Sequence, residues 1–171
     1  MPKVRSDELP EALLDCHLRL RQVTAAAGAL AAKTSAPVDE VQEVATKVHR
    51  YFTVALPLHE EDEERSLFPR LLARVPALAP TIARLREGHG AHAARVGAVV
   101  ALCRELQTWP ERFPTLRSEL ASAASALMES WEAHLSLEEA DLFPPVIAGL
   151  TAGDREAIRD EMRARRANLP R

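Results

Sequence analysis

Two copies of one short pattern combine histidine with glutamate at a spacing of four residues. The stretch HEEDEERSLFP begins at His59 and the stretch HLSLEEADLFP begins at His134, so both read HxxxEExxLFP. On a helix, residues four apart lie on the same face, one turn above the other. An imidazole and a carboxylate placed together in this way suit iron, manganese or zinc. The repeated pattern therefore first indicates metal chemistry.

The offset of 75 residues between the two copies also relates a further pair of histidines. Three pairs share it, namely His17 with His92, His59 with His134, and Glu63 with Glu138. In a hairpin of antiparallel helices, residues equidistant from the turn lie at the same level. The midpoints of the two histidine pairs, one in each half of the chain, are Val38 and Phe113, and both fall in predicted turns. The four histidines are therefore predicted at one level, with the glutamates about 6 Å along the axis.

Four imidazoles and two carboxylates facing a core would be costly as unpaired polar groups. Metal ions remove that cost, and two inward-facing glutamates can each bridge a pair of ions in a helical bundle. Any one of these residues alone is more often a core histidine or a solvated glutamate. Six of them at matched levels favour a metal centre.

Several neighbouring polar residues are weaker candidates. His89 lies one turn from His92 on the same predicted face, and Leu14 occupies the corresponding place in the first half. His89 is interpreted either as a seventh ligand or as a histidine that hydrogen-bonds near the centre. His49 is about 15 Å along the axis from His59, so we interpret it as structural.

The acidic run beside His59 is interpreted mainly as a solvated face. Its members are Glu60, Glu61, Asp62 and Glu64. Among them only Glu60, directly beside the histidine, is kept as a weak ligand candidate.

The composition indicates which elements hold these residues. The 171 residues are 47% hydrophobic and 4% aromatic with only 6 glycines, which is typical of an all-α protein. Turn-forming clusters at 33–39, 74–80 and 108–114 divide the chain into four long amphipathic segments. We therefore predict an antiparallel up-down-up-down four-helix bundle with a short C-terminal fifth helix.

A single domain is expected over residues 1–171, with the two-fold repeat at about 7–69 and 81–144. The fifth helix is predicted at about 151–166, where Thr151 and Asp154 resemble a capping box with Asp in place of Glu. The prolines Pro69 and Pro144 are predicted to end the second and fourth long helices at Phe68 and Phe143.

Pro57 lies two residues before His59 inside the second predicted helix. It is expected to kink that helix or open it locally.

Charge and hydropathy exclude other classes of function. The net charge is −3, with 22 basic and 25 acidic residues, so no basic surface for nucleic acid is expected. No apolar run approaches the length of a membrane span, and the N-terminus lacks the apolar core of a signal peptide. A cytoplasmic protein is expected, and Cys16 and Cys103 are then predicted to be reduced. The histidines are accompanied by no nucleophile arrangement and by no glycine-rich phosphate loop.

The set His17, HEEDE, His92 and HLSLE resembles the hemerythrin-like family, the HHE cation-binding domain. The resemblance covers nearly the whole chain. It implies a four-helix bundle with two iron ions in a non-haem centre, oxo- or hydroxo-bridged when oxidised. By resemblance the iron ligands are His17, His59, Glu63, His92, His134 and Glu138, with the two glutamates as bridges.

The chain departs from the oxygen-carrying hemerythrins, which resemble HxxxE, HxxxH and HxxxxD on helices two to four. Here the third segment has HGAH and the fourth has HxxxE, which argues against reversible oxygen transport. Three functions stay open. The centre could bind or sense a small diatomic ligand such as oxygen or nitric oxide, act as an enzyme on peroxide or ferrous iron, or hold a purely structural metal. The sequence does not identify a protein partner.

Overall fold

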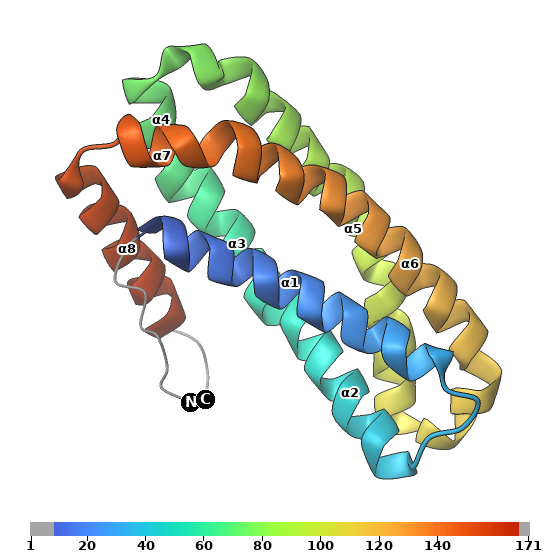
Figure 1. The fold of residues 1–171 in the computed structure, drawn as a ribbon. Helices are drawn as coiled ribbons and strands as arrows, with labels where there is room; N and C mark the ends of the chain where they lie inside the picture. The colour runs from blue at the N-terminus through green and yellow to red at the C-terminus, as the bar shows by residue number, and fades with distance from the viewer. Residues whose placement is uncertain (1–8, 168–171) are drawn as a thin grey trace. The chain divides into compact units, whose positions relative to one another are not determined.

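The computed structural model describes residues 9–167, and all regular structure in this range is helical (Figure 1). The α-helices are α1 (Leu9–Ala32), α2 (Val38–Arg50), α3 (Leu56–Asp62), α4 (Phe68–Arg74), α5 (Ala79–Thr108), α6 (Phe113–Leu137), α7 (Phe143–Ala148) and α8 (Ala152–Ala167). Short 3₁₀ turns at Pro76–Leu78 and Pro110–Arg112 precede α5 and α6. The predicted all-α bundle with a short C-terminal helix is confirmed. The expected start of the first repeat near residue 7 lies outside the described residues.

Three π turns interrupt the long helical segments, and each lies just before a proline. They span Tyr51–Ala55, Glu63–Leu67 and Glu138–Leu142. At each, the next residue donates its N–H to a carbonyl five residues earlier, as in the bonds from Leu56 to Tyr51, Phe68 to Glu63 and Phe143 to Glu138.

This arrangement corrects the prediction that Pro69 and Pro144 end their helices. The chain stays helical beyond both, through α4 to Arg74 and through α7 to Ala148. Proline lacks an N–H, and its ring clashes with the carbonyl four residues earlier in an α-helix. Widening the preceding turn by one residue relieves that conflict without ending the helix. The predicted local opening before Pro57 is confirmed by the π turn at Tyr51–Ala55.

The helices form two compact units by their contacts. Within the described residues, unit 1 comprises 9–18, 58–88 and 134–167, and unit 2 comprises 19–57 and 89–133. Unit 1 has an apolar core to which α1, α4, α5, α7 and α8 all contribute. Its buried members are Leu9, Leu13, Leu67, Phe68, Leu71, Ile82, Leu85, Leu142, Phe143, Val146, Leu150, Ile158 and Met162.

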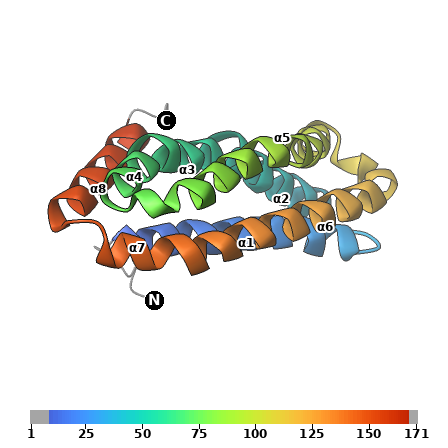
Figure 2. The same cartoon turned by 90° about the horizontal axis from the view of Figure 1, so that it is seen from above.

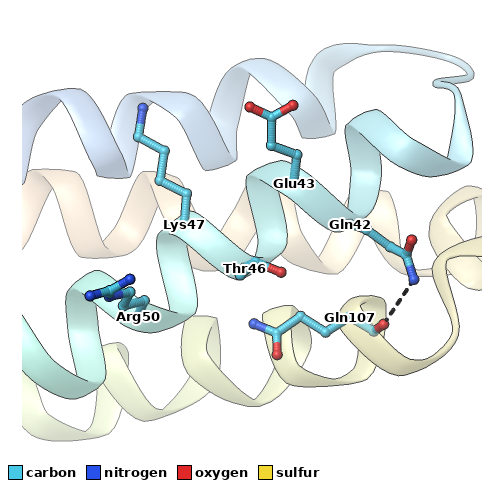
Figure 3. Close-up of a pocket in the computed structure, with 6 residues that line it drawn as sticks. All are labelled: Gln42, Glu43, Thr46, Lys47, Arg50 and Gln107. Atoms are coloured by element: carbon cyan, nitrogen blue, oxygen red, sulfur yellow. Dashed lines mark hydrogen bonds between the residues drawn. The ribbon is translucent and has the colours of Figure 1, made fainter. Parts of the chain in front are cut away.

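In unit 2, polar side chains tie pairs of helices together around an apolar interior. Arg21 of α1 donates two hydrogen bonds to the carboxylate of Glu132 on α6, at 2.9 and 2.8 Å. Gln42 of α2 donates to the carbonyl oxygen of Gln107 on α5 at 3.2 Å, beside a surface groove that Lys47 and Arg50 also line (Figure 3). The amide of Gln107 in turn donates to the carbonyl of Ala45 at 3.2 Å.

The C-terminal helix α8 begins with the predicted capping box. The N–H of Asp154 donates to Thr151 Oγ1 at 3.1 Å, and the N–H of Thr151 donates to Asp154 Oδ2 at 3.0 Å. These reciprocal bonds satisfy N–H groups that the first helical turn leaves open. The buried side chains of Ile158 and Met162 then fix α8 to the core of unit 1.

None of the helices within residues 9–167 combines the length and the apolar character that crossing a membrane requires.

Candidate metal centre

Four of the predicted ligands converge inside unit 1. His17 of α1, His59 of α3, Glu63 and Glu138 each place one ligand atom so that all four atoms lie within 4.8 Å of one another. None of the four residues is more than 3% exposed. Residues from three separate stretches of sequence therefore form one buried cluster of nitrogen and oxygen donors, which is the kind of site that the repeated pattern predicts.

Each carboxylate oxygen of Glu138 lies close to an imidazole nitrogen of a different histidine. His17 Nε2 lies 2.9 Å from Oε2, and His134 Nε2 lies 2.8 Å from Oε1. In the first HxxxE motif, His59 Nε2 lies 3.4 Å from Glu63 Oε1. The spacing of four residues therefore brings imidazole and carboxylate together in both motifs, as predicted.

Both glutamates open a π turn, and this local geometry helps to keep them buried. A π turn inserts one residue into the helix, so side chains before and after it can both face the core. In the turn Glu63–Leu67, Glu63, Ser66 and Leu67 are all buried. The prolines in the Leu-Phe-Pro sequences therefore serve the site by favouring this widened turn.

The opposite nitrogen of His17 has a carboxylate partner of its own. His17 Nδ1 lies 2.9 Å from Glu139 Oε1. An ionised carboxylate only accepts hydrogen bonds, so His17 Nδ1 donates to Glu139. The other ring nitrogen, Nε2, faces Glu138 Oε2 at 2.9 Å. These two atoms repel each other unless a proton on Nε2 or a cation lies between them. A bound metal ion fits this arrangement.

The pKa values of the two glutamates shift in opposite directions. Burial, reinforced by the neighbouring Glu138, raises the pKa of Glu63 well above its ordinary value of 4.5. Burial also raises the pKa of Glu138, but hydrogen bonds from His134 and His17 outweigh this effect and lower it below the ordinary range. With no cation, one of the two adjacent carboxyl groups therefore keeps a proton. A metal ion would supply positive charge to both.

Two predicted ligands, His89 and His92, belong to unit 2. A hydrogen bond of 2.6 Å joins His92 Nδ1 to Ser130 Oγ, and Trp131 stacks on the His92 ring with centroids 4.3 Å apart. His92 is 5% exposed. Such contacts fix the orientation of a metal-binding imidazole. His89 lies three residues earlier on α5 and is half-buried. The ligand role of each residue stays a prediction.

One expectation about the acidic run is wrong. The sequence places Asp62 on the solvated face, but it is only 1% exposed and forms ion pairs with Arg165 and Arg166 of α8, both at 2.7 Å. Burial of this carboxylate is possible because both of its oxygens face a guanidinium. The corresponding residue of the second half, Leu137, is apolar. That apolar counterpart was a signal in the sequence that this position faces inward.

The other members of the run are partly exposed, as expected for a solvated face. Glu61 pairs with Arg65 at 2.7 Å, and Glu64 pairs with Arg86 at 2.7 Å. The two cysteines are free thiols, as predicted. Sequence reasoning did not identify Glu139 and Ser130 as partners of the histidines, because hydrogen-bond partners on other helices leave no fixed spacing.

A family model places the chain in a known class of proteins. The hemerythrin HHE cation binding domain matches residues 9–146, so the chain belongs to this family. The match contains the whole buried His/Glu cluster, whereas α8 lies beyond it. A search of curated proteins found no match.

The contact between Glu139 and His17 leads to a first prediction. A Glu139→Ala variant is expected to bind metal about 10 to 100 times more weakly, because the imidazole loses the group that fixes its tautomer. Glu139→Gln, which keeps an acceptor oxygen, should lose less. Affinity can be measured by competition with a coloured chelator.

The internal repeat provides the matched control for this change. Glu64 corresponds to Glu139 in the first half but pairs with Arg86. Glu64→Ala should therefore leave metal affinity within about twofold of the wild type. Equal losses for Glu64→Ala and Glu139→Ala would show that the hydrogen bond to His17 has no special role.

Proposed function

We propose that this protein holds a non-haem centre of two iron ions that binds or senses a small diatomic ligand, such as oxygen or nitric oxide. The observation that carries the proposal is the buried cluster of His17, His59, Glu63 and Glu138, with its ligand atoms within 4.8 Å of one another. Two carboxylates at the centre of such a cluster can each bridge a pair of ions.

The chemistry of the donors supports iron. Imidazole and carboxylate groups are suitable for iron, manganese and zinc, whereas soft thiolate donors select other metals and clusters. Membership of the HHE cation-binding family adds support for iron. Six ligands are also more than one ion needs when two of them are carboxylates that can bridge. His92 and His134 stay predicted ligands, and two ions that share six ligands would still have positions open to a small ligand.

Bound iron would supply reversible redox chemistry and coordination of a small molecule. The surrounding residues set the conditions for it. Glu139 and Ser130 hold imidazoles in place through their Nδ1 atoms. Trp131 covers one face of the His92 ring and excludes bulky molecules from that face. Burial of the glutamates keeps bulk water away from the donor oxygens.

The proposal is tested with protein loaded with ferrous iron under anaerobic conditions. Absorption spectra are then recorded after separate additions of oxygen, nitric oxide and hydrogen peroxide. New charge-transfer bands with oxygen or nitric oxide that disappear when the gas is removed would support ligand binding. Evolution of gas from peroxide with repeated turnover would favour an enzyme instead. A protein that binds zinc but gives no iron-dependent response to any addition would leave only a structural role for the metal.

A further inference from the structure

Helix α8 contacts the segment that carries Glu63, although it lies outside the part of the chain that matches the family. It is rich in charged residues, and only Ile158 and Met162 of its residues are buried. Its remaining attachments to unit 1 are therefore mainly polar. Several of them involve the residues on either side of Glu63.

Asp62, the residue directly before Glu63, is held by two arginines of α8. Arg165 Nη1 lies 2.7 Å from Asp62 Oδ1, and Arg166 Nη2 lies 2.7 Å from Asp62 Oδ2. The Asp62 side chain is 1% exposed, and that of Arg165 is 17% exposed. A carboxylate this deeply buried requires its cations, because loss of either would leave charge without compensation.

Ser66, within the same π turn as Glu63, forms the second attachment. Arg165 Nη2 donates to Ser66 Oγ at 2.7 Å, and Ser66 Oγ donates to Glu161 Oε2 at 2.5 Å. Glu161 in turn accepts hydrogen bonds from Arg70 at 3.1 and 2.6 Å. Figure 2 shows α8 running beside α4, the helix that contains Arg70. One arginine of α8 therefore reaches both sides of Glu63.

The second HxxxE motif has no equivalent attachment at the matching positions. Leu137 corresponds to Asp62, and Asp141, which is exposed, corresponds to Ser66. The two π turns have the same local geometry, yet only the one that carries Glu63 is hydrogen-bonded to α8 through both positions. Because π turns are uncommon and less favourable than α-helix, an outside contact can determine how well one persists.

We propose that α8 is a positioning element of the metal centre. It holds Asp62 and Ser66, and through them the turn that presents Glu63. Docking of α8 and occupation of the centre by metal then stabilise each other. The inference rests on the proposed function, because it requires that the buried cluster binds metal. Such coupling is reciprocal, so anything that releases α8 weakens metal binding by the same factor as metal strengthens docking.

The first experiment compares metal-free and metal-loaded wild type by hydrogen exchange, with Zn²⁺ and Fe²⁺ as separate probes. We expect the amides of α8 to exchange about 5 to 100 times more slowly when metal is bound. The second experiment measures Zn²⁺ and Fe²⁺ affinity of Arg165→Gln and of the double variant Arg165→Gln/Arg166→Gln. A loss of about 10 to 100 times is expected for the double variant.

Arg163→Gln is the matched control, because Arg163 lies on the same helix and pairs only with Asp160 of that helix among the described ion pairs. Its affinity should equal that of the wild type. Arg165→Lys, which keeps the charge, should recover part of the affinity lost in Arg165→Gln. Circular dichroism of each metal-free variant shows whether it is folded, and the wild-type exchange measurement does not depend on any substitution.

The outcomes separate the inference from the function on which it rests. Wild-type protein that binds neither metal would overturn the proposed function, and the inference with it. Normal metal binding with unchanged α8 exchange, and with equal affinities for Arg163→Gln and the double variant, would overturn the inference alone.

Discussion

A Glu138→Gln variant is expected to bind iron at least about 100 times more weakly than the wild type, which corresponds to about 2.8 kcal/mol. Glu138 is fully buried, and both of its oxygens face imidazoles, from His17 at 2.9 Å and from His134 at 2.8 Å. Glutamine has nearly the same shape but carries no charge and offers only one oxygen. It therefore cannot bridge two ions, and its amide group would place hydrogens toward a ring nitrogen or a cation.

The control for this experiment is Glu132→Gln on the same helix. Glu132 forms a surface pair with Arg21 and its side chain is 50% exposed. Iron content after loading and dialysis should match the wild type for Glu132→Gln and fall strongly for Glu138→Gln. If Glu138→Gln retained the wild-type iron content and affinity, Glu138 would not be a ligand.

A Glu63→Gln variant is expected to be more stable than the wild type when both are metal-free, and less stable than the wild type when both are loaded with metal. Burial and the adjacent Glu138 raise the pKa of Glu63 above its ordinary value. A group whose pKa is raised by folding contributes stability at pH below its unfolded pKa, and that stability is lost as pH rises through the folded pKa. The metal-free wild type should therefore lose stability from this group as pH rises above about 4.5. Glutamine does not titrate and avoids this loss.

At pH 8, metal-free Glu63→Gln should be more stable than metal-free wild type by about 1 to 3 kcal/mol. The difference should shrink as pH falls toward and below 4.5, where Glu63 becomes protonated in the unfolded state as well as in the folded state. For a chain of this size, 1 kcal/mol corresponds to about 2 to 4 °C in Tm. With iron bound the order should reverse, because the wild type gains a ligand that the variant lacks.

Urea unfolding with a chelator present, repeated from pH 5 to pH 8, measures this linkage. Glu138 has the opposite shift, since its pKa is lowered, and its contribution is lost only as pH falls through and below its ordinary range. The two contributions therefore occupy different parts of the pH range. If the free energies of unfolding of wild type and Glu63→Gln differed by the same amount at every pH, that result would contradict the buried environment assigned to Glu63.

The pairing of histidine with glutamate in each motif could be predicted from sequence because its information is local and repeated. A spacing of four residues places His59 beside Glu63 in any helix, and the offset of 75 residues relates each to its counterpart. Tertiary structure was needed only to bring His17 and Glu138 to the first motif. The structure does so within 4.8 Å.

The effect of the prolines could not be decided from sequence. Ending a helix before proline and widening it into a π turn both relieve the same steric conflict. The choice depends on whether the residues beyond the proline can be buried. Leu71 after Pro69 and Val146 after Pro144 are both 0% exposed, which favours a continued helix.

The burial of Asp62 depends on residues more than one hundred positions away. A run of acidic residues is usually solvated, and nothing in the run itself distinguishes Asp62 from Glu61. The distinction comes from Arg165 and Arg166, which α8 places against one member of the run. Partners of this kind follow from the packing of α8 through Ile158 and Met162, not from local sequence.

The most direct test of the metal centre is the metal content of the purified chain after anaerobic loading with ferrous iron and removal of excess metal. Iron is measured against protein concentration determined by amino-acid analysis, and zinc and manganese are measured in the same samples. We predict two iron ions per chain, both lost in Glu138→Gln and both retained in Glu132→Gln. A single tightly bound zinc ion, or no retained metal at all, would contradict a di-iron centre at the buried His/Glu cluster.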